Sequence, residues 1–78
     1  ITAPLVGTFY KSSKPGDPAF VKVGDQIKVG QTLCIIEAMK IFNEIDSEVE
    51  GKIVEICVDD GSPIEYGQDL FRIQLNDK

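Results

Sequence analysis

The residues best suited to chemistry lie at the middle of the chain, around Lys40. Runs of apolar, β-forming residues at positions 32–36 and 41–45 flank a very short polar break, and this pattern predicts a β-hairpin. The break contains neither Gly nor Pro, although turns usually recruit Gly, Asn, Asp or Pro for their backbone properties. A long primary amine at a protruding tip is well placed to be acylated by another protein. Lys40 is therefore the candidate functional residue.

The neighbours of Lys40 strengthen this interpretation, because most surface lysines have no specific function. Ala38 and Met39 precede Lys40, and Ile41 and Phe42 follow it. The tip of a stable turn is normally polar, so apolar groups gathered at an exposed tip indicate contact with a partner or ligand.

Other kinds of chemistry lack the residues that they need. The sequence contains no His, which excludes base catalysis by imidazole and His-ligated metal sites. Cys34 and Cys57 lie in separate apolar runs without CxxC spacing, so we expect no zinc or iron–sulfur site and predict that both pack as small hydrophobic residues. No glycine-rich phosphate-binding motif occurs. The chain is therefore predicted to be non-catalytic and to hold no metal.

Length and charge narrow the class of protein further. The 78 residues form one domain, and the net charge is 8 − 13 = −5. Basic residues are too few and too scattered to follow a phosphate backbone, so nucleic acid is not an expected partner. The longest unbroken run of aliphatic residues and Cys, residues 33–36, is far too short for a membrane span. Because the chain starts at Ile1, we expect a domain excised from a longer protein, forming its C-terminal part.

An internal repeat organises the rest of the chain. Residues 23–36 align on residues 60–73, with two Gly, two Ile, one Gln and one Leu matching at a single offset. Upstream, residues 1–9 match residues 45–53 at an offset that is seven residues larger. The first copy therefore carries an insertion between residues 10 and 20, so the repeat predicts a domain with two-fold pseudosymmetry.

The insertion, at about residues 12–18, is rich in Ser, Pro, Gly and Asp and has no apolar periodicity. This composition predicts a surface loop with compact turns of its own. Long loops on small domains often carry function, so the loop is a second candidate site.

The patterning elsewhere is that of an all-β protein. Apolar and polar side chains alternate over residues 71–75, and Val54, Ile56 and Val58 are predicted to share one face of another strand. No window shows the spacing of an amphipathic helix. Two copies of a four-strand unit would form a small flattened barrel, with the Lys40 hairpin at the junction of the copies.

The sequence also resembles a known family. Residues 37–40, Glu-Ala-Met-Lys, resemble the attachment motif of biotinyl domains, and the likeness covers essentially the whole chain. The segments 7–10, 23–25, 34–37 and 43–45 resemble the biotin carboxyl carrier protein of bacterial and plastid acetyl-CoA carboxylase. The insertion resembles the protruding "thumb" of that carrier. Ile41 stands where the family usually has Met or Leu, and an apolar residue is thus kept.

The resemblance implies a barrel of two four-stranded antiparallel sheets and a covalent cofactor, biotin, on Lys40. A biotin protein ligase would activate biotin as its adenylate, and the Lys40 amine would attack the acyl carbon. The domain would then carry a carboxyl group from biotin carboxylase to carboxyltransferase, which makes malonyl-CoA from acetyl-CoA for fatty acid synthesis. The parent protein is expected to be a homo-oligomeric, non-catalytic carrier subunit, located in the bacterial cytoplasm or the plastid stroma.

Several side chains acquire expected roles from this resemblance. Met39 and Ala38 are expected to contact the cofactor or partner pockets, although Met39 could instead cap the barrel end. Ser12 and Ser13 of the thumb are candidates to hydrogen-bond the ureido ring of biotin, unless the thumb is only a tolerated insertion. The expected contacts with the ligase or carboxylase are Glu37, Ile41, Glu44 and Glu65, whose carboxylates could equally be ordinary solvated groups.

Three alternative functions remain open. A lipoyl domain shares the duplicated barrel, but it normally has Asp before its lysine and Ala after it, and Met39 and Ile41 oppose this reading. The domain could also be an unmodified adaptor barrel. A biotin carrier of another carboxylase or of a decarboxylase is disfavoured by the insertion at 12–18.

Overall fold

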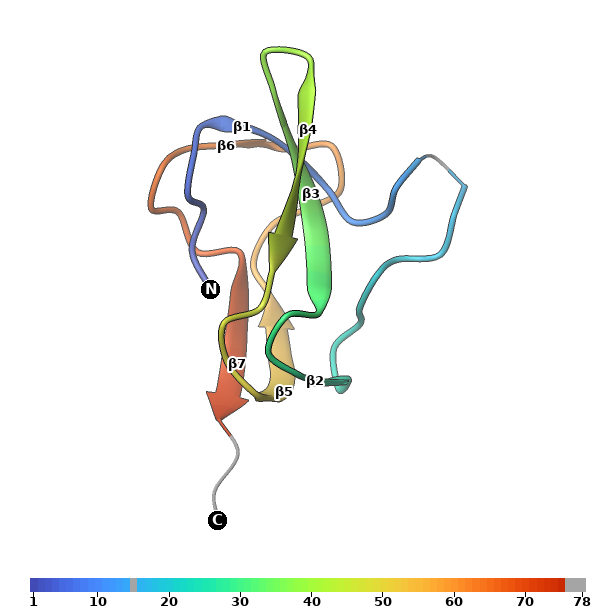
Figure 1. Cartoon of the computed structure of the whole chain (residues 1–78), viewed down its shortest axis with the longest axis vertical. Helices are drawn as coiled ribbons and strands as arrows, with labels where there is room; N and C mark the ends of the chain where they lie inside the picture. Colours follow the sequence, from blue (N-terminus) through green and yellow to red (C-terminus); the bar gives the residue numbers. More distant parts are fainter. Residues whose placement is uncertain (15, 76–78) are drawn as a thin grey trace.

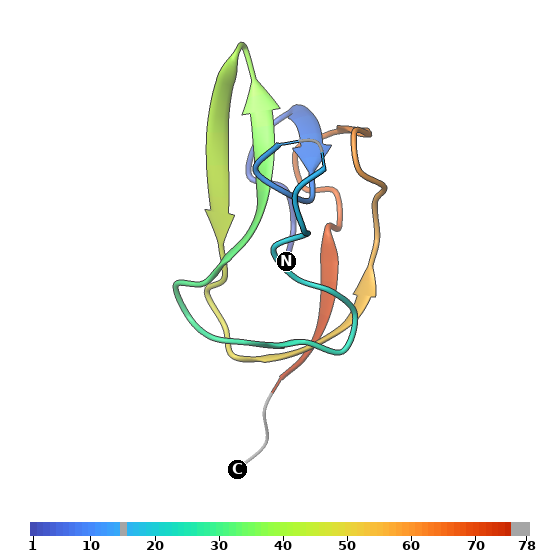
Figure 2. The same ribbon diagram turned by 90° about the vertical axis from the view of Figure 1, so that its right-hand side faces the viewer.

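The computed structural model describes residues 1–14 and 16–75 of the chain. These residues form seven strands and no helix, and the strands are arranged in two antiparallel sheets (Figures 1 and 2). The all-β prediction is confirmed. Among the residues described, there is no helix with the length and apolar character that crossing a membrane requires.

The first sheet contains four strands in the order β4, β3, β1, β6. β3 (Thr32–Ala38) and β4 (Ile41–Asp46) form the predicted hairpin, which projects beyond the other strands at one end of the molecule (Figure 1). β1 (Gly7–Tyr10) pairs with β3 on the other side, and β6 (Pro63–Ile64) pairs with β1. Because β4 is an edge strand, the hairpin is held to the rest of the sheet through β3 alone.

The second sheet contains β2 (Gln26–Ile27), β5 (Gly51–Ile56) and β7 (Phe71–Leu75), in that order. Each of the two sheets includes one short strand from the opposite half of the repeat. β6 comes from the second copy and joins the first sheet, whereas β2 comes from the first copy and joins the second sheet.

The second sheet differs from the expectation of four strands. Its fourth position is held only by Thr2, which forms an isolated antiparallel bridge with Asp69. In the repeat alignment, this bridge is the counterpart of the pairing between Thr32 and Asp46 at the end of β4. Among the residues described, this sheet therefore has three full strands and a single bridge.

The predicted pseudosymmetry is confirmed at the point where the strands approach most closely. A Cβ on Gly7 would lie 2.4 Å from the carbonyl oxygen of Glu37, and a Cβ on Gly51 would lie 2.4 Å from that of Gln74. These are equivalent contacts in the two copies, and no side chain fits at either. The strand β1 therefore packs against β3 in the same way as β5 packs against β7.

The core lies between the two sheets and is built largely from equivalent residues of the two copies. Phe9 and Phe71 meet at its centre, with ring centroids 6.0 Å apart and an interplanar angle of 58°. The buried cluster consists of Ala3, Phe9, Val21, Ile27, Leu33, Cys34, Ile36, Ile53, Ile64, Leu70 and Phe71.

A β-bulge overturns one prediction about which residues face this core. Ile53 pairs with Ile73, but Glu55 pairs with Arg72, so Val54 is an extra residue in β5. The bulge breaks the period of two, so Ile53 is buried and Val54 is exposed. The prediction that Val54 shares a face with Ile56 is therefore wrong.

The inserted segment forms part of the long loop between β1 and β2, which projects from the side of the barrel (Figure 1). The base of the loop is closed by the amide of Phe20, which donates to the carbonyl oxygen of Lys11 at 2.9 Å, and by the amide of Lys11, which donates to Asp60 Oδ1 at 2.9 Å. Of the predicted thumb, 12–18, Pro15 lies outside the described residues.

Candidate functional site

The tip of the β3–β4 hairpin is a two-residue turn made by Met39 and Lys40. Ala38 and Ile41 form the last strand pair before the turn. Met39 has a φ of 53° and Lys40 a φ of 66°, and these are the only described residues other than Gly with a positive φ. A type I′ turn requires positive φ at both central residues, and for this reason natural sequences favour Asn-Gly there. Each non-glycine residue in the left-handed region costs about 1–2 kcal/mol, so the tip is strained.

The side chains of the turn are almost fully in solvent. Met39 is 94 % exposed, and Lys40 is also exposed. The alternative in which Met39 caps the end of the barrel is therefore wrong. Within the described residues the one ion pair joins Arg72 to Glu55 at 3.0 Å, so no carboxylate holds the Lys40 ammonium. The amine stands free at the end of the molecule.

The apolar residues after the turn are exposed as well. Ile41 and Phe42 are each 63 % exposed. Ala38 is half-buried, since it lies in the last pair of the strand ladder. The predicted exposure of apolar side chains at the tip is thus confirmed, and contiguous exposed apolar side chains are typical of a contact surface.

One face of the hairpin looks toward the thumb across a groove of about 300 Å³. Glu37 lies opposite Phe42 in the strand ladder, and both line this groove. The hydroxyl of Tyr10 donates to Glu37 Oε1 at 3.4 Å. Burial, together with the negative charge of Glu37, raises the pKa of Tyr10. Tyr10 therefore remains a neutral donor, and it ties β1 to β3 close to the turn.

The thumb supplies the opposite wall of this groove, including both of the predicted serines. Ser12 is buried, and its hydroxyl donates to the carbonyl oxygen of Lys14 at 3.0 Å. Ser13 is exposed, and its hydroxyl donates to Asp17 Oδ2 at 3.0 Å. Both hydroxyl protons are thus used within the thumb, which leaves their oxygens as acceptors for a further group.

The remaining predicted contact residues are distributed unequally. Glu44 is exposed on the edge strand β4, three residues after Ile41, where that strand leaves the turn. Glu65 is exposed in the turn after β6 and lines neither of the grooves beside the hairpin. The structure therefore places Glu37 and Ile41 next to the turn, whereas Glu65 lines neither groove.

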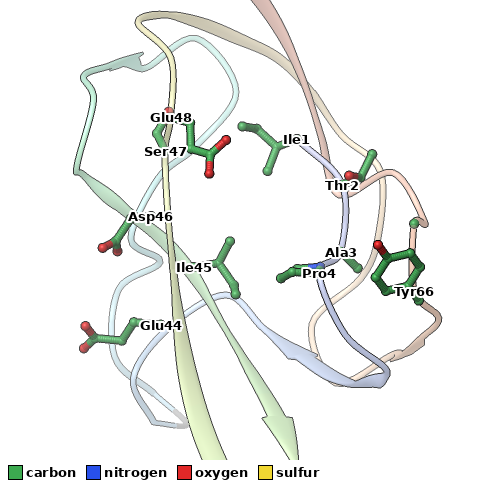
Figure 3. A pocket seen from close by; sticks show the side chains of 11 residues that line it. Ile1, Thr2, Ala3, Pro4, Glu44, Ile45, Asp46, Ser47, Glu48 and Tyr66 are labelled. Carbon is green, nitrogen blue, oxygen red and sulfur yellow. The ribbon is translucent and has the colours of Figure 1, made fainter.

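A larger groove of about 730 Å³ lies between the N-terminal segment and the end of β4 (Figure 3). Ile1 and Ile45, which are equivalent in the repeat, point into it, as does the carboxylate of Glu48, while the carboxylates of Glu44 and Asp46 point away (Figure 3). The groove is thus lined by both apolar and charged groups, and it lies where the two copies of the repeat meet.

The cysteines and acidic residues form no reactive or metal-binding centre in the described part of the chain. No group of three or more His, Cys, Asp or Glu side chains is arranged to hold a metal ion among these residues. Cys34 is fully buried, and burial raises the pKa of its thiol to about 12. Cys57 is half-buried, and both cysteines are free. The prediction that they serve as packing residues is confirmed for Cys34.

Sequence reasoning missed two residues next to the site, Tyr10 and Val6. Tyr10 gave no separate signal, because its partner Glu37 is far away in the sequence. Val6 did give a sequence signal, since the repeat aligns it with Glu50, so a hydrophobic residue stands where the second copy has a charged one.

The fold and the exposed hairpin lysine together define a class of domain. A sequence model of the family described as "Biotin-requiring enzyme" matches residues 1–73. The chain belongs to this family, and its cofactor is biotin.

The relatives narrow this class further. The chain is 54 % identical over 74 residues to the biotin carboxyl carrier protein of acetyl-CoA carboxylase from Nostoc sp., covering 95 % of this chain and 41 % of that protein. It is 55 % identical over 74 residues to the protein of the same name from Pyropia yezoensis, covering 95 % of this chain and 47 % of the relative. For Chlamydia trachomatis the identity is 47 % over 73 residues, covering 94 % of this chain and 44 % of the relative. The predicted resemblance is confirmed, and the chain spans less than half the length of these relatives.

Proposed function

We propose that this domain is the biotin carrier of an acetyl-CoA carboxylase and that Lys40 is the residue to which biotin is attached. The observation that carries the proposal is the tip of the hairpin. A lysine and a methionine occupy a turn whose backbone favours Asn-Gly, and both side chains are in solvent. Strained residues of this kind persist where function requires them. The family and the names of the relatives supply the identity of the attached group.

The residues at the tip fit the attachment of a carboxylic acid through an amide bond. Lys40 is the only primary amine in the turn and has no carboxylate partner among the residues described. A lysine is protonated at neutral pH, so the modifying enzyme must remove a proton before the nitrogen can attack. A biotin protein ligase would use ATP to join the carboxyl group of biotin to AMP.

The Lys40 nitrogen would then use its lone pair to form a C–N bond with the carboxyl carbon of biotin. The bond between that carbon and AMP breaks, and its electron pair leaves with AMP. The second proton lost from nitrogen passes to a base of the ligase. Acylation removes one positive charge and changes the formal net charge of the domain from −5 to −6.

Once attached, biotin supplies a nitrogen that carries a carboxyl group. The contribution of the domain is to hold this group on a projecting tip and at high effective concentration near two other active sites. The proposed partners are therefore the ligase, a biotin carboxylase and a carboxyltransferase that forms malonyl-CoA. In this scheme the domain is a non-catalytic part of a multi-subunit enzyme in the bacterial cytoplasm or the plastid stroma.

The side chains around the tip have proposed roles that follow from their positions. Met39 and Ile41 would enter apolar pockets of the partners, since Met adapts readily to different surfaces. The groove between the hairpin and the thumb would accept the biotin ring in a resting position. There the acceptor oxygens of Ser12 and Ser13 would face the N–H groups of the ureido ring.

The test is to incubate the domain with a biotin protein ligase, biotin and ATP, and to map the modification by mass spectrometry. We expect one biotinyl group on Lys40 and none on the Lys40→Arg variant, with the melting temperature of this variant unchanged because the side chain is exposed. The variant Lys22→Arg, which alters another exposed lysine, is the control and should be modified normally. Biotin on a different residue would overturn the proposal, as would a lipoyl group on Lys40 in protein isolated from cells.

A further inference from the structure

A second groove, with no thumb residue in its lining, lies beside the hairpin and has a volume of about 590 Å³. Its walls are residues 5–8 on one side and residues 37–39 on the other. Val6 is 63 % exposed, and Met39 is 94 % exposed. We refer to the side chains of Leu5, Val6 and Met39 as the Val6 shelf.

The position of the shelf is fixed by the close packing of β1 on β3. Gly7 follows Val6 directly, and a Cβ on Gly7 would lie 2.4 Å from the carbonyl oxygen of Glu37. Thr8 then pairs with Glu37 in the strand ladder. Because Glu37 is separated from the turn only by Ala38, this contact holds Val6 near the turn end of β3.

The repeat provides an internal comparison for the shelf. The counterpart of Val6 in the second copy is Glu50, which is also exposed, and the Gly51 that follows it makes the equivalent close contact. An exposed position in this backbone environment therefore accommodates a charged residue. The copy that bears the attachment lysine has a large apolar side chain instead, which lowers solubility unless a partner covers it.

We propose that the Val6 shelf is a docking surface for the biotin protein ligase, an inference that rests on the function proposed above. The ligase must bring its active site to the Lys40 nitrogen itself, so its surface must close around the hairpin and meet the adjoining groove. Enzymes that act on attached biotin meet the ring at the end of a much longer arm. Because the shelf includes Met39, the residue next to the acceptor lysine, its position favours the ligase as its occupant.

The test compares two matched substitutions in the 78-residue domain. Val6→Asp places a charge on the shelf, whereas Val29→Asp places one at a valine that is equally exposed (65 %) in the turn before β3. Initial rates of biotin incorporation are measured with purified ligase at increasing concentrations of the domain. We expect Val6→Asp to lower kcat/KM about tenfold, mainly through KM, and Val29→Asp to leave it unchanged.

Two further measurements separate docking from other effects. Melting temperatures show whether the variants fold, and Val6→Thr, which keeps the shape of the side chain, should fold normally and still raise KM severalfold. Calorimetric titration of ligase with domains carrying Lys40→Arg should show the same loss of affinity for Val6→Asp without any reaction.

Equal kcat/KM for Val6→Asp and the unsubstituted domain would overturn the docking proposal. So would normal biotinylation of Val6→Asp combined with slower carboxylation by biotin carboxylase, because the shelf would then serve that enzyme. A failure of the unsubstituted domain to accept biotin at all would instead overturn the proposed function.

Discussion

Replacing the turn residues with Asn-Gly should stabilise the domain while removing its attachment site. In Met39→Asn/Lys40→Gly, Asn tolerates the left-handed region better than Met, and Gly adopts it freely. The positive φ values of 53° and 66° would then cost less. Removing the backbone strain should stabilise the folded state by about 1–2 kcal/mol at the Gly position and by less at the Asn position. The greater flexibility of Gly in the unfolded chain should reduce this gain by about 0.5–1 kcal/mol.

The net gain should be about 1 kcal/mol, since few packing contacts are lost when a side chain that is 94 % exposed is replaced. For a domain of this size, 1 kcal/mol corresponds to a rise of about 4–8 °C in melting temperature. Thermal unfolding followed by circular dichroism measures this shift, and incubation with the ligase should give no biotinylation.

The matched control is Met39→Ala/Lys40→Ala, which removes the same side chains but leaves two non-glycine residues at positive φ. Its melting temperature should stay close to that of the unsubstituted domain. If the Asn-Gly variant melts at the same temperature as the Ala-Ala variant, or lower, then the turn stores no strain.

Two other predictions follow from the packing. Gly7→Ala and Gly51→Ala should each destabilise the fold by about 1–3 kcal/mol, because their new methyl groups meet the carbonyl oxygens of Glu37 and Gln74 at 2.4 Å. In ligase assays on the folded fraction, only Gly7→Ala should slow biotinylation. Equal slowing by both substitutions would contradict the proposal that the surface beside Gly7 contacts the ligase. Burial raises the pKa of Cys34 to about 12. The contribution of the neutral, buried thiol to the free energy of unfolding is therefore complete below the pKa of an unfolded thiol, near 9, and decreases as the pH rises toward 12. Melting temperatures measured from pH 8 to 11 should therefore fall less in Cys34→Ala than in the unsubstituted domain, and parallel curves would refute the assignment.

The sequence predicted the elements that have a strong local pattern. The hairpin was predicted because β-forming residues flank one short break, and the pseudosymmetry because equivalent glycines recur at fixed offsets. The backbone at the tip was not predicted, since the left-handed conformation of Met39 and Lys40 follows from the pairing of Ala38 with Ile41 and not from residue preference.

Features that depend on how one strand or loop packs against another could not be predicted from the sequence either. The apolar pattern around Val54 suggested one continuous face, but the register of β5 against β7 inserts an extra residue there. Similarly, the burial of Ser12 depends on how the thumb folds back, which its turn-forming composition does not specify.

The exchange of β2 and β6 between the two halves of the repeat has a consequence for folding. One copy alone would lack a strand that only the other copy supplies, so each half resembles a subunit of a strand-swapped dimer whose two chains have been fused. Fragments cut between the copies should therefore remain unfolded when separate and should regain structure only when mixed. By the same reasoning the domain should unfold in one cooperative step, and a destabilising substitution near β2 should also destabilise the hairpin that carries Lys40.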